Sequence, residues 1–260
     1  MADRVLQTDA LEAPLYFLER NEIWDSTKPY TFQYYTKEKF PRTNVLQSPS
    51  LTRINDMRSH CTPATLEAEG FTFSRFSSKM QHSDFQDEEK VASVYCRELE
   101  SHFLDLLGAK HVRALDYQVR RRLPEYPYFG GKIPPSPQPS LLTHADATLQ
   151  SAEQIVRELY GKDAEQVLQS RFQIITVWKP CRGPVKDWPL AVCDATSVER
   201  SDLLPADVIY PNYLAENCMI HFNPNQRWYW LPEQESDEIL IFKAIDSSNP
   251  TSSYPVLGPK

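Results

Sequence analysis

The chain lacks the patterns that mark several large classes of protein. Only seven of its 260 residues are glycine, and Gly130-Gly131 is not followed by a phosphate-binding loop motif. No stretch approaches the ~20 consecutive apolar residues that cross a bilayer. Residues 1–14 contain acids and no apolar core, unlike a signal peptide. We therefore expect a cytoplasmic protein without a membrane partner.

Positive charge and paired cysteines are also scarce. The net charge is -7, and the longest basic run is Arg120-Arg121-Arg122, so nothing favours a nucleic-acid partner. The five cysteines are odd in number and form no CxxC pair, which predicts reduced thiols rather than disulfides or a zinc site. The sequence contains no GxSxG motif, which would have indicated a serine nucleophile.

What is abundant points to strands and stiff loops. Proline occurs 21 times and aromatic residues make up 12% of the chain. Five segments rich in β-branched or aromatic residues are predicted to be strands. They are Tyr30–Tyr35, Phe172–Trp178, Cys218–Phe222, Arg227–Leu231 and Ile239–Ile245.

Two helices are expected beside these strands. An apolar stripe of helical period predicts a helix over Asp87–Leu107, with Asp84 as its N-cap and Gly108 at its end. A second helix is expected over Ala152–Gln169, with Ser151 as its N-cap.

The chain shows no linker and no internal repeat. We expect a flexible arm over residues 1–13, a single domain over 14–247 and a tail over 248–260. Short strands with two helices predict a mainly β fold with flanking helices, either a β-sandwich or a jelly roll.

The segment His144-Ala145-Asp146 carries the clearest chemical pattern. On a strand, residues i and i+2 point to the same face, so the imidazole and the carboxylate lie together. These are two of the three ligands in the 2-His-1-carboxylate triad of iron(II) oxygenases. After Asp146 the printed sequence contains one further histidine, His221.

Several short motifs, in order along the chain, resemble the fungal hydroxylase/desaturase family typified by the aspergillic-acid cluster enzyme, which is related to gibberellin-desaturase-like and cephem-methoxylase-like proteins. They are Lys28-Pro29-Tyr30, Thr43-Asn44, Asn55-Asp56-Met57-Arg58, Glu69-Gly70-Phe71, Val119-Arg120-Arg121-Arg122, His144-Ala145-Asp146, Val177-Trp178-Lys179-Pro180, Pro189-Leu190-Ala191-Val192-Cys193-Asp194, Arg227-Trp228-Tyr229-Trp230, Asp237-Glu238, Phe242-Lys243 and Asp246-Ser247.

The resemblance implies a double-stranded β-helix (jelly-roll) fold of the iron/2-oxoglutarate oxygenase type and a role in secondary-metabolite biosynthesis. In members with oxygenase activity, a proline-histidine motif after the Asp-Ser pair supplies the third iron ligand, and an arginine-rich strand follows it. Here Asp246-Ser247 is followed by Ser248-Asn249-Pro250, and neither motif occurs in the printed sequence. This departure indicates a degenerate iron site.

Our leading hypothesis from these residues is an enzyme that keeps the family pocket but needs no cofactor. It would catalyse a non-oxidative cyclisation or cycloaddition of the hetero-Diels–Alder type, which requires mainly proximity and hydrogen bonds. The candidate catalytic residues are His144, Asp146, His221, Arg120 and Arg122. On a strand, the two arginines would share one face.

An apolar or polycyclic small metabolite is the expected ligand, because aromatic residues dominate the remaining motifs. The candidate substrate-binding residues are Trp178, Trp228, Tyr229 and Trp230.

Two alternatives stay open. The first is an iron(II)/2-oxoglutarate-dependent hydroxylase/desaturase in which His144, Asp146 and His221 bind the metal. The second is a non-catalytic partner subunit, whose exposed sheet edge a homodimer or heterodimer would cover.

Overall fold

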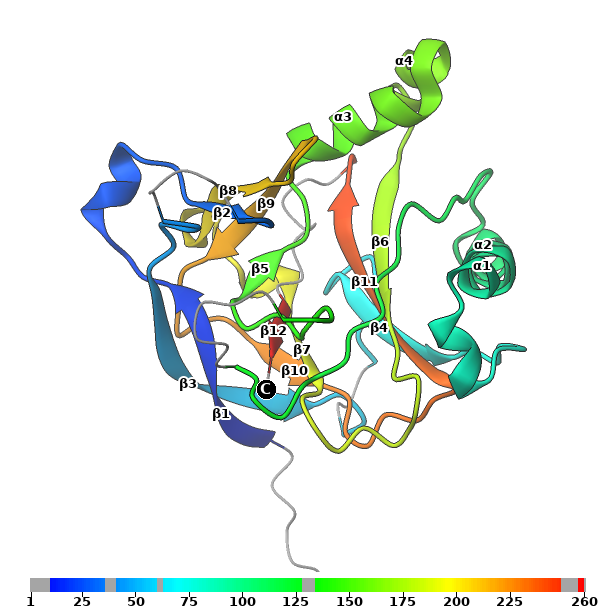
Figure 1. Cartoon of the computed structure of the whole chain (residues 1–260), viewed down its shortest axis with the longest axis horizontal. Helices are drawn as coiled ribbons and strands as arrows, with labels where there is room; N and C mark the ends of the chain where they lie inside the picture. Colours follow the sequence, from blue (N-terminus) through cyan, green and yellow to red (C-terminus); the bar gives the residue numbers. More distant parts are fainter. Residues whose placement is uncertain (1–9, 36–40, 60–62, 128–133, 249–256, 260) are drawn as a thin grey trace, which may run out of the picture.

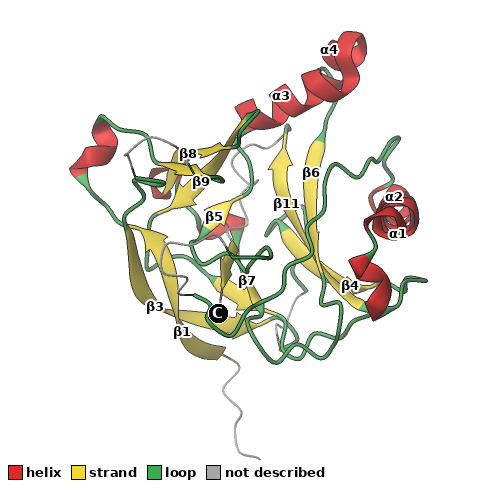
Figure 2. Ribbon diagram, in the orientation of Figure 1, coloured by secondary structure: helices red, strands yellow, loops and turns green. Residues whose placement is uncertain are grey.

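A large curled sheet and a smaller one form the body of the molecule (Figures 1 and 2). The computed structural model describes residues 10–35, 41–59, 63–127, 134–248 and 257–259. Within these residues, a nine-stranded sheet has the order β1-β3-β10-β7-β12-β5-β9-β8-β2. A three-stranded sheet has the order β4-β11-β6. The expected mainly β fold with flanking helices is confirmed.

The strands are short apart from β1, β3 and β11, in keeping with a sheet that curls strongly. Their bounds are β1 Ala10–Leu18, β2 Tyr30–Phe32, β3 Gln47–Asp56, β4 Phe71–Arg75, β5 His144–Ala145, β6 Gln173–Trp178, β7 Leu190–Cys193, β8 Leu203–Ile209, β9 Leu214–Ile220, β10 Trp228–Trp230, β11 Glu238–Asp246 and β12 Leu257–Pro259.

The first expected helix is present, with a different cap. It consists of α1 (Glu88–Lys90), a π-helical segment and α2 (Cys96–Leu107). Asp87 caps it by accepting a hydrogen bond from the Lys90 backbone N–H. Asp84, the predicted cap, instead accepts from the Gln81 backbone N–H of a preceding 3₁₀ turn. Gly108 ends the helix in the left-handed conformation, as expected.

The second expected helix starts earlier and breaks. It spans α3 (Leu149–Tyr160) and α4 (Ala164–Leu168). The Thr148 hydroxyl caps α3 by accepting from the Ser151 backbone N–H, so the prediction of Ser151 as the cap is wrong. At Gly161 the backbone adopts φ 52° and leaves the helix. Figure 1 shows both helices above the sheets.

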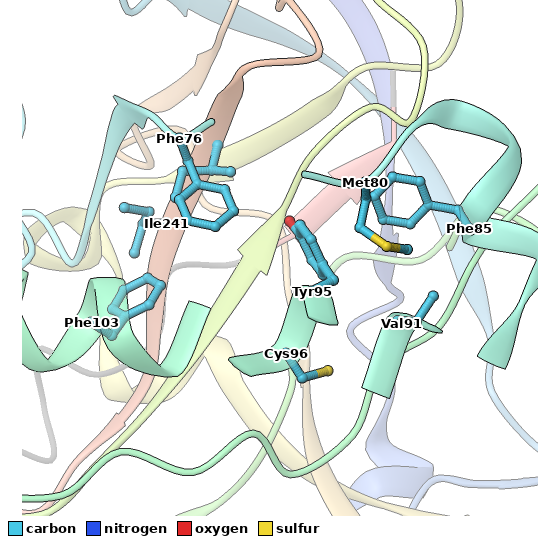
Figure 3. Close-up of a cluster of buried hydrophobic side chains, with 9 residues drawn as sticks. Phe76, Met80, Phe85, Val91, Tyr95, Cys96, Phe103 and Ile241 are labelled. Carbon is cyan, nitrogen blue, oxygen red and sulfur yellow. The ribbon is translucent and has the colours of Figure 1, made fainter. Parts of the chain in front are cut away.

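β11 forms the centre of the core, because both of its faces are covered. Leu240 and Phe242 pack with residues of the larger sheet such as Tyr229. Ile239 and Ile241 face the other way, toward the helices. Figure 3 shows this outer cluster, in which α2 and the preceding loop pack against Ile241. A strand buried on both faces has a mostly apolar sequence, and this is why the sequence predicts a strand here.

The predicted arm and tail differ from the structure. β1 begins at Ala10 and pairs with β3 over its full length, so residues 10–13 belong to the sheet. Residues 1–9 and 249–256 lie outside the described part. The predicted tail includes β12, which pairs with β5 and β7.

Cys96, Cys181, Cys193 and Cys218 are free thiols, while Cys61 lies outside the described residues. Among the described helices, none is both long and apolar enough to cross a membrane.

Candidate functional site

The structure places His144 in β5 of the larger sheet and Asp146 directly after this strand, with their side chains next to each other. His144 pairs with Met219 of β9 on one side and with Leu257 of β12 on the other. Its Nε2 lies 3.4 Å from Asp146 Oδ1. Thr176 of β6, in the smaller sheet, donates to Asp146 Oδ2 at 2.8 Å. The pair therefore lies where the two sheets approach each other.

The backbone determines which nitrogen of His144 is available. Nδ1 lies 2.8 Å from the Leu142 carbonyl oxygen, which can only accept, so Nδ1 carries the proton. In the neutral ring, Nε2 then presents a lone pair to Asp146. Two acceptors facing each other need a proton or a cation between them. This arrangement orients His144 as a metal-binding histidine is oriented.

Asp146 is held in its ionised form. Burial alone would raise its pKa, but the interactions with His144, Thr176 and Arg120 hold the pKa below the ordinary value. The side chain nevertheless keeps 31% of its surface accessible. An ionised carboxylate that solvent reaches suits ligand binding better than core packing.

His221 lies in a different environment from the pair. It is buried, its Nδ1 hydrogen-bonds to the Leu18 carbonyl at 2.9 Å, and its backbone carbonyl accepts from Gln226. Burial lowers its pKa, although the Leu18 bond opposes this. In the part of the chain that the structure describes, no three His, Cys, Asp or Glu residues form a metal-binding group. The geometry therefore does not bring His221 to His144 and Asp146, because His221 is tied to the end of β1.

The two candidate arginines do not lie on a strand, and they diverge. Their segment is extended coil, so the shared-face expectation is wrong. Arg122 Nε forms an ion pair with Asp187 Oδ2 at 2.5 Å. Arg120 Nη1 donates to the Gln138 carbonyl at 3.0 Å, and its guanidinium is close enough to Asp146 for their charges to interact.

The four candidate aromatic residues separate by face. Thr176 and Trp178 share one face of β6 by alternation, and Trp178 packs with Tyr229 and β11 in the cluster between the sheets. These two aromatic residues therefore belong to the interior that Thr176 and Asp146 border.

Trp228 and Trp230 point to the opposite face of β10. Trp228 has no exposed surface and packs edge-on against Phe17, with ring centroids 5.8 Å apart. Trp230 packs against the same cluster. A substrate cannot touch Trp228 without displacing the core, so packing explains this residue better than binding.

Sequence reasoning missed Thr176 and Gln138. Thr176 lies in a strand that was predicted, and its alternation with Trp178 was the available signal. Gln138 lies in a proline-rich loop with no pattern. Its side chain donates to the Arg121 carbonyl at 2.7 Å and accepts from the Leu123 backbone N–H at 2.9 Å. Only the folded chain shows that it positions the arginine segment.

Comparison with known proteins gives a consistent set of relatives. A family model described as the oxidoreductase/YMDC permease-like domain matches residues 15–256. The chain is 32% identical over 213 residues to the Fe(II)/2-oxoglutarate-dependent dioxygenase nvfI of Aspergillus novofumigatus, covering 79% of this chain and 73% of that protein. It is 28% identical over 212 residues to the hydroxylase/desaturase efuI of Hormonema carpetanum, covering 75% and 70%.

A solved structure supports the same relationship. The iron and alpha-ketoglutarate-dependent endoperoxidase NvfI superposes with a TM-score of 0.82 at 26% identity, covering 96% of this chain and 90% of that one. The resemblance to fungal hydroxylase/desaturases and the oxygenase-type jelly roll are thereby confirmed. The prediction that the chain needs no cofactor is wrong, because nvfI, which is similar in both sequence and structure, is named as dependent on iron and 2-oxoglutarate.

Proposed function

The chain belongs to the oxidoreductase/YMDC permease-like domain family, and on that premise we propose that it is an iron(II)- and 2-oxoglutarate-dependent oxidoreductase of fungal secondary metabolism. The observation that carries the proposal is the His144–Asp146 pair, whose Nε2 and Oδ1 atoms face each other at 3.4 Å. The named activities of the relatives agree with it.

The donor set fits iron(II) at two positions. The Leu142 carbonyl fixes the tautomer of His144, and Thr176 holds one oxygen of Asp146, so the remaining oxygen and Nε2 converge. One nitrogen and one carboxylate are the ligand types that iron(II) takes in facial triads. A third protein ligand is not found among the described residues.

Iron with 2-oxoglutarate supplies the activation of dioxygen, which no side chain provides. The residues of the chain would hold the metal and shape its surroundings. His144 and Asp146 would bind it, and Thr176 would keep Asp146 in orientation. Trp178, which is only partly buried, would offer an aromatic surface to an apolar or polycyclic metabolite, with Tyr229 packed behind it.

The kind of product is a separate prediction. Cyclisation of an apolar intermediate, expected from the sequence, would give a product of the same formula as its substrate and no succinate. Hydroxylation, desaturation or endoperoxide formation would consume oxygen, and coupled turnover would release succinate. A role as a homodimeric or heterodimeric partner subunit also stays a prediction, which activity of the isolated chain would contradict.

Anaerobic titration tests the metal site directly. Purified protein is titrated with iron(II) in the presence of 2-oxoglutarate, and the visible charge-transfer absorption of the ternary complex is recorded. We expect a saturable band that is lost in His144→Ala and kept in His111→Gln, an exposed histidine outside the site. A protein without the band, or a band unchanged in His144→Ala, would contradict the proposal.

A further inference from the structure

Neighbouring arginines in the extended segment before the site have different partners. Arg122 has a carboxylate, that of Asp187 at 2.5 Å. The side chain of Arg120 donates to the Gln138 carbonyl, and among the described residues no carboxylate lies within ion-pair distance of it. Arg122 therefore has an ion-pair partner within the fold, whereas Arg120 interacts with the charge of Asp146 at longer range.

The fold holds the Arg120 segment firmly. Arg121 donates its backbone N–H to the Pro137 carbonyl at 3.0 Å. Gln138 holds the same segment through the Arg121 carbonyl and the Leu123 backbone N–H. A guanidinium presented in this way loses little conformational entropy when a ligand arrives.

The charged and polar groups that face Arg120 come from several elements. They are Asp146 beside β5, Tyr126 in the preceding loop, and Tyr210 in the β8–β9 turn. Solvent reaches the side chain, yet the surrounding protein removes enough of its hydration to lower its pKa. A partly desolvated cation whose charged neighbour Asp146 lies beyond ion-pair distance favours an incoming anion.

The β8–β9 turn adds an aromatic surface near this cation. Tyr210 and Tyr213 stack with ring centroids 4.4 Å apart and 7° between their planes. The Tyr210 backbone N–H donates to the Tyr213 carbonyl, which closes the turn. A cation beside stacked rings and a metal-binding pair suits an organic acid.

We propose that Arg120 anchors the carboxylate of a small-molecule ligand beside the His144–Asp146 pair. The inference rests on the proposed function for the place of the ligand. Guanidinium and carboxylate match as a bidentate pair, which lysine does not reproduce. The carboxylate has two sources, 2-oxoglutarate or an apolar organic acid that is the substrate, and both present the same group to Arg120.

Calorimetric binding to the full chain tests the anchor and identifies the source. The probes are 2-oxoglutarate, 1-naphthoate and the uncharged 1-naphthamide, each measured with redox-inert Mn(II) and without metal. We expect Arg120→Gln to lower the binding affinity for one of the two carboxylates, 2-oxoglutarate or 1-naphthoate, by about tenfold to a hundredfold. The affinity of Arg120→Lys should lie between those of the wild type and Arg120→Gln. Arg121→Gln, which alters an exposed neighbour, should bind the carboxylate with wild-type affinity.

A labelling experiment on the unaltered protein covers the case in which the variants fold poorly. Phenylglyoxal modifies accessible arginines, and mass spectrometry reports the site. The carboxylate that binds should protect Arg120 at least several-fold and leave Arg121 unchanged.

The proposal is overturned if wild-type protein binds neither carboxylate, if Arg120→Gln and Arg121→Gln bind alike, or if 1-naphthamide loses as much affinity as 1-naphthoate. If Arg120→Gln loses carboxylate binding and the wild-type protein shows no iron-dependent absorption band, Arg120 is still the anchor, but the oxidoreductase proposal is rejected.

Discussion

Asp146 and Asp246 are both ionised aspartates at strand ends, and their surroundings differ in kind. Asp246 has 1% of its side chain exposed and accepts from Arg171, Lys243, Gln173 and Ser248. Asp146 has 31% of its side chain exposed, accepts a hydrogen bond from the Thr176 hydroxyl and lies beside His144. A carboxylate whose acceptor sites are filled by the fold stabilises the fold, whereas one with vacant acceptor capacity can bind a ligand.

Replacing Asp246 is expected to have the largest effect. Asp246→Ala leaves Lys243, which has 1% of its side chain exposed, as a buried ammonium without its carboxylate partner. Breaking a buried ion pair in this way costs about 3–5 kcal/mol of unfolding free energy. Urea denaturation followed by circular dichroism measures it. A loss below about 1 kcal/mol would show that Asp246 is not the counter-ion the core needs.

Replacing Asp146 is expected to separate activity from stability. Asp146→Ala should reduce iron-dependent succinate formation by more than about a hundredfold, because a metal ligand outweighs its supporting partners. Its unfolding free energy should change by no more than about 1 kcal/mol, since the side chain is partly exposed. If Asp146→Ala released succinate at the wild-type rate, Asp146 would not be a metal ligand, and it would not differ from Asp246 in function.

The hydroxyl of Thr176 gives a finer test of the same site. Thr176→Val removes the donor to Asp146 Oδ2 while it keeps the side-chain shape. Iron(II) affinity should fall by about tenfold to a hundredfold, as for other partners that orient a ligand. Thr176→Ser, which keeps the hydroxyl, is the matched control. Equal affinities of the Val and Ser variants would indicate that Thr176 serves β6 packing alone.

The acid limb of the stability curve is expected to show the smallest effect. Burial would raise the pKa of Asp246, but Arg171, Lys243 and its other partners hold it below the ordinary value. In the unfolded chain the pKa is about 3.9. The stabilisation is therefore complete above pH ~4 and declines as the pH falls below it, because only the unfolded chain then binds the proton.

Equilibrium unfolding at several pH values between 5 and 3 checks this prediction. Wild type should lose stability faster than Asp246→Asn below pH ~4, by up to about 1.4 kcal/mol per pH unit. Parallel curves would assign the acid sensitivity to other carboxylates such as Glu238, whose pKa the Arg58 bond also lowers.

Features that depend on residues near in sequence were predictable. The apolar stripe and Gly108 located the helix that ends at Leu107, and the apolar run located β11. Even there, the caps were misplaced, because Asp84 and Asp87 or Thr148 and Ser151 satisfy the same sequence rule. Which of them bonds the free backbone N–H depends on where the preceding loop enters.

The sequence indicated which kinds of residue form the candidate site, but not which individual residues come together in it. His144 and Asp146 are two residues apart, so strand geometry alone brings them together. His221 is of the right type but bonds to Leu18 of β1, and nothing near it in the sequence indicates that partner. The sequence offers no reason to assign different roles to Arg120 and Arg122. The fold distinguishes them, because Asp187 pairs with Arg122.

The strand-rich composition, the order of the family motifs and the His144–Asp146 pair can be read from the sequence alone, because composition, order and i, i+2 spacing are properties of the chain itself. Which charged side chains are paired depends on contacts that form when the chain folds. Arg171, which pairs with Asp246, lies 75 residues from it, and the partners of Arg122 and His221 lie 65 and 203 residues away. Hydrogen bonds act over about 3 Å in space, and separation along the chain does not encode that distance.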